Sequence, residues 1–370
     1  MMKALVTGAT GFIGSTLCEE LLSAGIPVRA LHRPSSDSSF LSTLSVELVS
    51  GDVTNRDSLR AAMRGCDRVF HLAALFREAK FPSSEYWRVN LEGTRNVLEV
   101  ASEIGIPYVG YCSTTGVLGN VKNPPANETT DYAPLDVYQE SKTEAEKLAV
   151  SWFRSGKISG SVIRPAMVYG PRDTRLFKLF RGIASRTLPV IGDGKTWCHW
   201  VLGRDVARAF RLASETTASH GNVYIIGGEH PISLEESMRI IADEYGVSLL
   251  PFRIPVLPIQ LLGSLVEAVC FPLGLEPPLH RRRADFFTKN RSFDCSRART
   301  DLGYAPSYPV NEEIRSVARW YTEAGWLPQL SGGRTRLLST PTPKRQSLAR
   351  RTSDSLPTQE TVPSNSSMTE

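Results

Sequence analysis

Three glycines near the start of the chain constrain its fold more than any other feature. Gly8, Gly11 and Gly14 stand three residues apart, directly after an apolar run at 4–6 and before leucines at helical spacing. A strand, a glycine-rich turn and a helix in this order aim backbone N–H groups and a helix N-terminus at an anion. Open α/β sheets bind a dinucleotide pyrophosphate at such a turn after their first strand. The commoner spacing is G-x-G-x-x-G, so a turn with a purely structural role stays open until the rest of the chain is considered.

Strand and helix patterns alternate through the first 170 residues of the chain. Strands are predicted at 4–6, 28–31, 46–49, 68–72, 108–111 and 160–163, and helices at 57–63, 90–103 and 137–152. Strands separated by helices predict βαβ units with right-handed crossovers. The sequence therefore predicts an α/β protein with a Rossmann-type, doubly wound parallel sheet and a smaller C-terminal substrate lobe.

The pattern is less regular after residue 170, where helices are predicted at 176–184, 234–245 and 311–321. We expect residues 1–170 to form mainly the dinucleotide-binding domain. Residues 171–330 are expected to form mainly the substrate-binding lobe, with some return to the core. Residues 331–370 are rich in Ser, Thr and Pro and contain no aromatic residue, which predicts a disordered tail.

Composition excludes several other classes of protein. The formal net charge of +5 is modest, so nucleic acid is not expected as a partner. The six cysteines are scattered without a C-x-x-C pair, which argues against a metal site and a disulfide framework and fits a reducing compartment. No charged and apolar leader precedes the first strand, so no signal peptide is predicted and a cytoplasmic location is expected.

The most apolar stretch of the chain is the segment 254–275, which is too short and too interrupted to cross a bilayer. Pro255, Pro258, Pro272 and Glu267 break it. Two interpretations stay open: a helix that packs on the substrate lobe, and a helix in peripheral contact with a membrane surface.

Tyr138 and Lys142 form a second informative pair. They are four residues apart in a predicted helix, so they share one face. A nearby ammonium favours the phenolate and lowers the pKa of a tyrosine from about 10 toward neutrality. Such a tyrosine can exchange a proton with an alcohol or carbonyl oxygen near pH 7. A surface Tyr/Lys pair without function is the alternative that this motif alone leaves open.

Ser113 and Thr114 follow the predicted fifth strand, at the carboxyl edge of the sheet. A hydroxyl there can hydrogen-bond the substrate oxygen and orient it toward the tyrosine. The alternative is a loop hydroxyl that bonds only to the local backbone.

Together, the glycine turn, these hydroxyls and the Tyr-x-x-x-Lys helix resemble the extended short-chain dehydrogenase/reductase family. The resemblance covers about residues 3 to 327 and extends to these further segments: Gly51-Asp52-Val53, His71-Leu72-Ala73-Ala74, Val89–Thr94, Arg164–Pro171 and Leu302-Gly303-Tyr304. One segment departs from the family pattern, because Gly203-Arg204 stands where relatives usually have a His-Val-x-Asp sequence, although Asp205 is retained.

The resemblance implies roles for individual residues. Tyr138 would be the catalytic acid/base, and Lys142 would lower its pKa and hold the nicotinamide ribose. Thr114 best matches the family's Ser/Thr position, Ser113 is the neighbour that could replace it, and Asn90 would support the site through its helix. Cofactor contacts are implied for Gly8, Thr10, Gly11, Phe12, Ile13, Gly14, Arg33, Asp52, Val53, Leu72, Ala73, Ala74, Tyr138, Lys142, Pro165 and Val168.

Arg33 bears on the choice of cofactor. A carboxylate at the end of the second strand would chelate the ribose hydroxyls of NAD, whereas an arginine there accommodates the 2′-phosphate of NADP. The predicted second strand ends without a carboxylate and is followed by Arg33. NADP is therefore the predicted cofactor, and NAD stays open because Asp37 follows closely.

The implied function is an NAD(P)-dependent oxidoreductase that acts on a secondary alcohol or ketone. Within the family the sequence looks like the dihydroflavonol reductase, 3β-hydroxysteroid dehydrogenase and hopanoid-associated sugar epimerase branch, which favours an apolar steroid-, flavonoid- or lipid-like substrate. A nucleotide-sugar epimerase or dehydratase is the first alternative, with Arg172, Arg175 and Lys178 as a pyrophosphate clamp. A cofactor-binding regulator without catalysis is the second. Pairing through the helices at 90–103 and 137–152 is common in the family, so a homodimer is an open expectation.

Overall fold

The computed structural model describes residues 3–76, 81–259 and 281–328, together with Leu261, Gly263 and Val266. The tail at 331–370 and most of the segment 254–275 lie outside the described residues, so the expectations for them are not addressed by the structure. Within the described residues, no helix has the length and apolar character needed to span a membrane.

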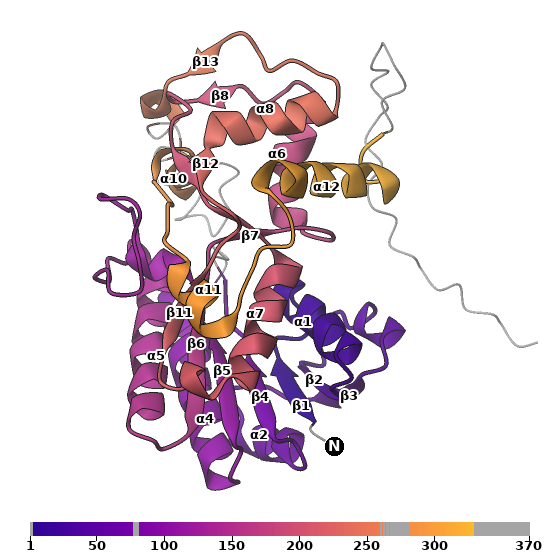
Figure 1. Ribbon diagram of the computed structural model, residues 1–370, viewed down its shortest axis with the longest axis vertical. Coiled ribbons are helices and arrows are strands. Elements are labelled where there is room, and N and C mark those ends of the chain that lie inside the picture. The colour runs from indigo at the N-terminus through magenta and orange to yellow at the C-terminus, as the bar shows by residue number, and fades with distance from the viewer. Residues whose placement is uncertain are drawn as a thin grey trace, which may run out of the picture. The chain divides into compact units, whose positions relative to one another are not determined.

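Seven parallel strands form the central sheet (Figure 1), in the order β11-β6-β5-β4-β1-β2-β3. They are β1 (Ala4–Thr7), β2 (Val28–His32), β3 (Glu47–Ser50), β4 (Arg68–His71), β5 (Tyr108–Cys112), β6 (Ser159–Pro165) and β11 (Val223–Ile226). The order reverses between β1 and β4, and the doubly wound parallel sheet predicted from the sequence is confirmed. Six of the strands lie where they were predicted, and β11 was not predicted.

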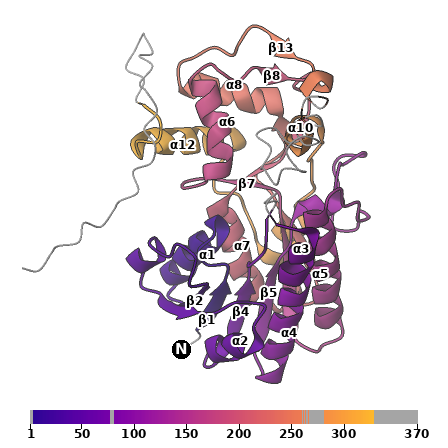
Figure 2. The ribbon, with the colours of Figure 1, turned by 180° about the vertical axis from the view of Figure 1, so that it is seen from behind.

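Helices cover both faces of the sheet. One face packs on α1 (Phe12–Ser23), α7 (Gly203–Glu215) and α11 (Ser296–Leu302), and the other on α2 (Arg56–Met63), α4 (Gly93–Glu103) and α5 (Val137–Arg154). Figure 1 shows α7 beside α1, and Figure 2 shows α4 and α5 side by side from behind. Between α3 (Ser83–Tyr86) and α4 the chain forms one wide π turn, η2 (Trp87–Glu92), so the helix predicted over 90–103 begins in a different geometry.

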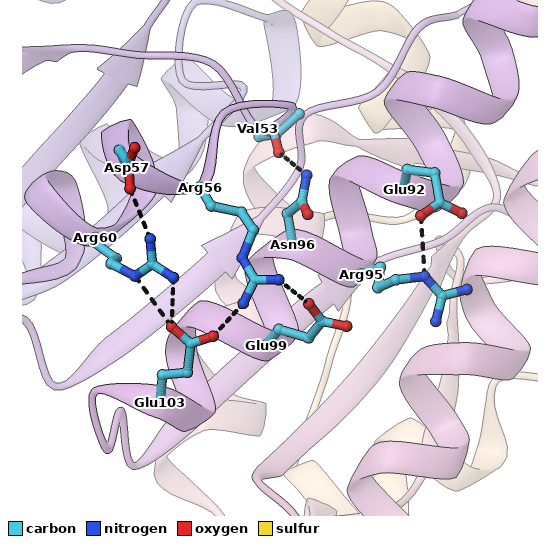
Figure 3. Close-up of polar contacts among 9 residues, drawn as sticks. All are labelled: Val53, Arg56, Asp57, Arg60, Glu92, Arg95, Asn96, Glu99 and Glu103. Carbon is cyan, nitrogen blue, oxygen red and sulfur yellow. Dashed lines mark hydrogen bonds and ion pairs between the residues drawn. The ribbon is translucent and has the colours of Figure 1, made fainter.

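Ion pairs join α2 to α4 on the outer side of the molecule (Figure 3). Arg56 and Arg60 of α2 face Glu99 and Glu103 of α4, with N–O distances of 2.6 Å for Arg56–Glu99 and 2.9 Å for Arg60–Glu103. The Asn96 side chain donates to the Val53 carbonyl at 3.1 Å in the same region. Exposed pairs contribute little individually, but this network fixes α2 and the Val53 loop against α4.

A second apolar core lies beyond the carboxyl ends of the strands (Figure 1), among α6 (Thr174–Ala184), α8 (Leu234–Glu244) and α12 (Val310–Glu323). The three helices occupy the ranges predicted from apolar spacing. The remaining elements are short: β7 (Met167–Tyr169), β8 (Val190–Ile191), β9 (Trp197–Cys198), β10 (Trp200–Leu202), β12 (Ile232–Ser233), β13 (Arg253–Ile254), α10 (Arg281–Thr288), η1 (Leu41–Thr43), η3 (Thr115–Leu118) and η4 (Thr217–Ser219).

Candidate active site

The glycine turn between β1 and α1 has a geometry that side chains would prevent. Gly8 has φ 68°, and a Cβ there would lie 2.6 Å from the Ala73 amide nitrogen. A Cβ on Gly14 would overlap the Gly8 carbonyl, and the Gly11 amide donates to that carbonyl at 3.0 Å. Gly11 is the N-cap of α1 and makes no side-chain cap bond. The predicted turn thus leaves N–H groups of the first turn of α1, where Phe12 and Ile13 lie, open to an anion.

A buried hydrogen-bonded chain fixes the end of β4 against this turn. His71 Nδ1 lies 2.8 Å from Thr7 Oγ1, and His71 Nε2 lies 3.0 Å from Thr94 Oγ1. Because Thr94 donates its own proton to the Asn90 carbonyl, His71 Nε2 is the donor to Thr94 and Nδ1 accepts from Thr7. Burial, with a smaller contribution from Lys142, lowers the pKa of His71 to about 3, so the ring is neutral. The predicted cofactor-contact residues Leu72, Ala73 and Ala74 follow directly, and the Ala73 amide donates to Thr7 Oγ1 at 3.2 Å.

Asn90 lies buried in the π turn and joins three elements. Its Oδ1 accepts from the Leu75 amide at 2.7 Å, and its Nδ2 donates to the Leu75 carbonyl at 3.2 Å and to Ser141 Oγ at 2.9 Å. Asn90 therefore ties the loop after β4 to α5. This contact pattern fits the predicted supporting role, and single π turns are frequent at functional sites.

Tyr138 and Lys142 lie on the inner face of α5, which begins at an N-cap where Asp136 accepts from the Gln139 amide at 2.9 Å. Both side chains are buried. Lys142 Nζ donates to the Cys112 carbonyl at 2.6 Å and lies 4.3 Å from the centre of the Tyr111 ring. Burial lowers the pKa of Lys142 to about 8, against opposing effects of Cys112 and Glu146.

The ring of Phe76 packs edge-on against Tyr138, with 4.9 Å between the ring centres. Phe76 itself is 44% exposed. A partly exposed aromatic ring therefore lies directly beside the tyrosine of the Tyr-x-x-x-Lys motif.

Three consecutive hydroxyls follow β5 and have different partners. Ser113 donates to the buried carboxylate of Glu146, and Thr115 donates to the Pro165 carbonyl at 3.2 Å. Thr114, between them, accepts from the Gly116 amide at 3.0 Å and is the N-cap of η3. Within the described residues its hydroxyl proton has no protein acceptor, so it is the one of the three that can donate to a ligand.

Glu146 and Arg164 form a buried ion pair that sequence reasoning missed as part of the site. The Arg164 Nε lies 3.0 and 3.1 Å from the two carboxylate oxygens of Glu146, and Nη2 lies 2.5 Å from Oε1. Tyr132 also donates to Oε1, at 2.7 Å. The spacing of Glu146 could have indicated its place in the site. Tyr138, Lys142 and Glu146 follow one another at four-residue intervals and so share one helical face.

Arg175 lies between the glycine turn and the Tyr138 region. Its guanidinium is 5.6 Å from the ring centre of Phe12 and 5.7 Å from that of Phe76, and Nη2 donates to the Val168 carbonyl at 3.3 Å. The departure at Gly203 has a steric consequence here, because a Cβ on Gly203 would lie 3.0 Å from the Phe12 ring. The absence of a side chain at Gly203 thus leaves room for Phe12.

Arg33 and Asp52 lie at the other end of the turn, after β2 and β3. Arg33 is exposed and, in the part of the chain that the structure describes, makes no ion pair. Asp52 Oδ1 accepts from the amide and the hydroxyl of Thr54, both at 2.8 Å, which fixes the loop that carries Val53. Asp37 is exposed and accepts from the Ser39 amide at 2.9 Å.

A pocket of about 410 Å³ lies apart from these residues. Its lining includes Trp197, His199, Phe293 and Arg299, and it includes none of the predicted site residues. Tyr138 and the glycine turn, rather than this pocket, carry the geometry that the sequence motifs pointed to.

Comparison with known proteins places this geometry in context. A sequence profile described as the NAD dependent epimerase/dehydratase family matches residues 4–227. The chain is 28% identical over 338 residues to a 2-alkyl-3-oxoalkanoate reductase of Shewanella oneidensis, covering 85% of each chain. It is also 28% identical over 344 residues to the 3beta-hydroxysteroid-dehydrogenase/decarboxylase isoform 1 of Arabidopsis thaliana, covering 84% of this chain and 77% of the relative. Among solved structures, gox2253 superposes with a TM-score of 0.74 at 31% identity, covering 88% of this chain and 99% of the other.

Proposed function

The chain belongs to the NAD dependent epimerase/dehydratase family, and from this premise we propose that it is an NAD(P)-dependent oxidoreductase of secondary alcohols or ketones. The observation that carries the proposal is the arrangement of three groups. Tyr138 and Lys142 are buried on one face of α5, and the Thr114 hydroxyl proton at the end of β5 has no acceptor among the described residues. These are the groups that proton transfer to a substrate oxygen requires.

The residues present fit a dinucleotide. A Cβ on Gly8 or Gly14 would fill the space beside the β1–α1 turn, and α1 begins without a side-chain cap. The uncapped N–H groups would hold the pyrophosphate. When bound, the nicotinamide supplies or accepts the hydride. Leu72, Ala73, Pro165 and Val168 would line its binding site.

The protein's own groups would handle the proton. In the reducing direction, the Tyr138 hydroxyl donates its proton to the substrate carbonyl oxygen, and in the oxidising direction the phenolate takes it back. The Lys142 ammonium stabilises the phenolate, and its pKa of about 8 leaves it mostly charged at neutral pH. Thr114 donates a hydrogen bond to the same substrate oxygen and so orients it.

Arg33 supports NADP as the preferred cofactor. An exposed guanidinium without an ion-pair partner among the described residues is free to form two parallel hydrogen bonds with a 2′-phosphate. Asp37, whose carboxylate bonds to its own loop, is the group through which NAD would be held instead.

An apolar substrate is supported by two observations. The exposed ring of Phe76 lies against Tyr138, so an apolar surface borders the reacting position. The names of the two curated relatives describe an alkyl-substituted oxoalkanoate and a hydroxysteroid, both largely hydrocarbon. We infer a substrate of this class for this chain.

Nucleotide-sugar epimerisation or dehydration is the second candidate, favoured by the family as a whole. It needs a clamp for a pyrophosphate, and two of the three predicted clamp residues have other partners. Arg172 lies 3.5 Å over the Phe40 ring, and Arg175 donates to Asp173 at 2.8 Å. The third candidate, a regulator without catalysis, is disfavoured by the presence of Tyr138 and Lys142 in one buried arrangement.

A screen of ketones and alcohols with both cofactors tests the proposal. The set includes oxoalkanoates, sterols, flavonoids and nucleotide sugars, and the absorbance of the reduced nicotinamide is followed. We expect net turnover with an apolar compound, whereas an epimerase shows no net change in absorbance.

Tyr138→Phe is expected to lower kcat by about a thousandfold, because it removes the acid/base while keeping the ring. Tyr308→Phe, at an exposed position, is the matched control. Equal kcat values for Tyr138→Phe and the wild type would remove the basis of the proposed mechanism.

The remaining expectations belong to the same proposal. We infer that the enzyme is cytoplasmic and that two copies pair through α4 and α5 into a homodimer. We also infer a cofactor domain at 1–170 and a substrate lobe at 171–330, part of which returns to the core. The alternative for location is an enzyme that contacts a membrane surface through residues 254–275. Size-exclusion chromatography with light scattering, and sedimentation with vesicles, test the two associations.

A further inference from the structure

Three buried side chains repeat at four-residue intervals along α5. Tyr138, Lys142 and Glu146 are 7%, 3% and 0% exposed and share the helical face that packs on the ends of β5 and β6. The proposed function accounts for the first two. Glu146 lies one turn further from the substrate and has no role in that mechanism.

The carboxylate of Glu146 is saturated with donors. Arg164 donates from Nε and Nη2, Tyr132 donates at 2.7 Å, and Ser113 donates to the other oxygen. A fully buried ion pair is weak evidence for stability, because well-packed apolar residues in its place are often equally stable. The role of the Glu146–Arg164 pair is therefore inferred from the residues that it holds in position.

What it holds is the end of β5. Lys142 Nζ donates to the Cys112 carbonyl, and the next residue, Ser113, donates to Glu146. The last residue of β5 and the residue after it are thus both attached to α5. Thr114 comes next, and its orientation follows from this attachment together with the bond from Thr115 to Pro165.

Glu146 also affects the charge of Lys142. Burial disfavours the ammonium, and the negative charge of Glu146 opposes that effect. The other groups around Lys142 are Cys112 and the ring of Tyr111 on β5, neutral His71 on β4, and Tyr138. Without the negative charge of Glu146, Arg164 would lose its ion-pair partner and keep the Glu128 carbonyl as an acceptor. Both changes would disfavour a charged Lys142.

We propose that Glu146 is a positioning residue of this active site, which orients Thr114 through Ser113 and keeps Lys142 charged in a buried environment. The inference rests on the proposed function for its kinetic consequences. Its electrostatic consequence concerns Lys142 alone and is measurable without any substrate.

Glu146→Gln in the full chain is the first test, because it keeps the size of the side chain and one acceptor oxygen and removes the charge. We expect kcat to fall about tenfold with little change in the KM for cofactor. The alkaline limb of kcat/KM for ketone reduction should move to lower pH by about one unit. Glu144→Gln, on the exposed side of the same helix where Glu144 pairs with Lys147, is the matched control and should behave as wild type.

Ser113→Ala separates the two effects, since it leaves the Glu146–Arg164 pair intact. Ser113→Ala should lower kcat without moving the alkaline limb of the pH profile of kcat/KM. If Glu146→Gln does not fold, Ser113→Ala still tests the positioning role of Glu146. An unchanged kcat in Ser113→Ala overturns that role.

NMR titration of the lysine side chains, with Lys142 assigned by its loss in Lys142→Met, gives a readout without activity. The pKa of Lys142 should be lower in Glu146→Gln than in wild type. A folded Glu146→Gln protein with unchanged Lys142 titration and unchanged kcat overturns the inference. A wild-type protein without turnover on any substrate instead removes the proposed function, while the titration still tests the effect of Glu146 on Lys142.

Discussion

The role proposed for Thr114 depends on the hydrogen bonds that its two neighbours make. Ser113, Thr114 and Thr115 are chemically similar. Ser113 and Thr115 donate to protein acceptors, whereas the Thr114 hydroxyl has none in the part of the chain that the structure describes. The sequence left Ser113 and Thr114 as alternatives, and the contacts favour Thr114.

Thr114→Val is expected to lower kcat about a hundredfold with a smaller change in KM, because the lost hydrogen bond matters most as charge develops on the substrate oxygen. Steady-state kinetics with the best ketone measures this. Thr129→Val, at an exposed loop position, is the control. A normal kcat in Thr114→Val would move the role to Ser113.

Arg33→Ala is expected to raise the KM for NADP by about ten- to a hundredfold and to leave that for NAD unchanged, since it removes charge-assisted hydrogen bonds to a 2′-phosphate. Initial rates with both cofactors measure the change, and Arg64→Ala is an exposed control. If wild type already has the lower KM for NAD, and Arg33→Ala does not alter it, NADP preference is wrong.

At this scale, local motifs predicted Tyr138, Lys142 and the glycine turn because each depends on residues close in sequence. Glu146 was missed because its burial depends on Arg164 of β6 and on Ser113, the residue that follows β5. A glutamate in a helix normally predicts a solvated surface, and nothing local reverses that expectation.

The proposed cofactor site is built on α1 and the turn before it. Glycine within a helix usually costs stability relative to alanine, by up to about 1 kcal/mol. At Gly14 the Cβ would overlap the Gly8 carbonyl, so the ordinary preference is reversed.

Gly14→Ala is therefore expected to reduce cofactor affinity by at least about tenfold and to lower the melting temperature. Cofactor titration by fluorescence and a thermal melt test both. Ser23→Ala, near the C-terminal end of the same helix, should change neither property appreciably. Unchanged affinity in Gly14→Ala would show that the turn can open without loss of the cofactor.

Elements were predictable where apolar periodicity extends over several turns, as in α5 and α12. The two-residue strands β8, β9, β12 and β13 were not, because each exists only through pairing with a distant partner. Likewise residues 90–92, the last three of η2, were expected to begin an ordinary α-helix, since a 3.6-residue period does not report a single wide turn.

At the scale of the whole molecule, a buried carboxyl group lies on α12, one of the helices that form the second apolar core. Glu313 of α12 is fully buried, and neither of its oxygens has a hydrogen-bond partner among the described residues. Burial raises its pKa to about 8, and the groups that face it are Tyr169, Asp205, Arg204 and Glu229.

This raised pKa predicts pH-dependent stability. The folded protein binds the Glu313 proton more tightly than the unfolded chain does, so the free energy of unfolding falls as pH rises from about 4.5 to about 8. Glu313→Gln should remove a few kcal/mol of that decline. Urea unfolding at pH 5 and pH 8.5 measures it, with Glu312→Gln on the exposed side of α12 as control. Parallel declines in Glu313→Gln and wild type would contradict the prediction.

The sheet predicted from the first 170 residues lacked one strand. β11 is four residues long and lies far along the chain, and neither its length nor its surroundings distinguish it from the irregular segments on either side. Its place beside β6 is set by tertiary pairing, as is the packing of α7 on α1.

That late strand has a consequence for how the protein is made. Until residues 203–226 leave the ribosome, β6 has an open edge and one face of the sheet lacks the cover of α7. The proposed cofactor site lies in the first half of the chain, yet the sheet that carries it is completed only by the second. A fragment ending near residue 170 would present a paired-strand template and an uncovered apolar face to its neighbours, and would aggregate rather than bind a dinucleotide.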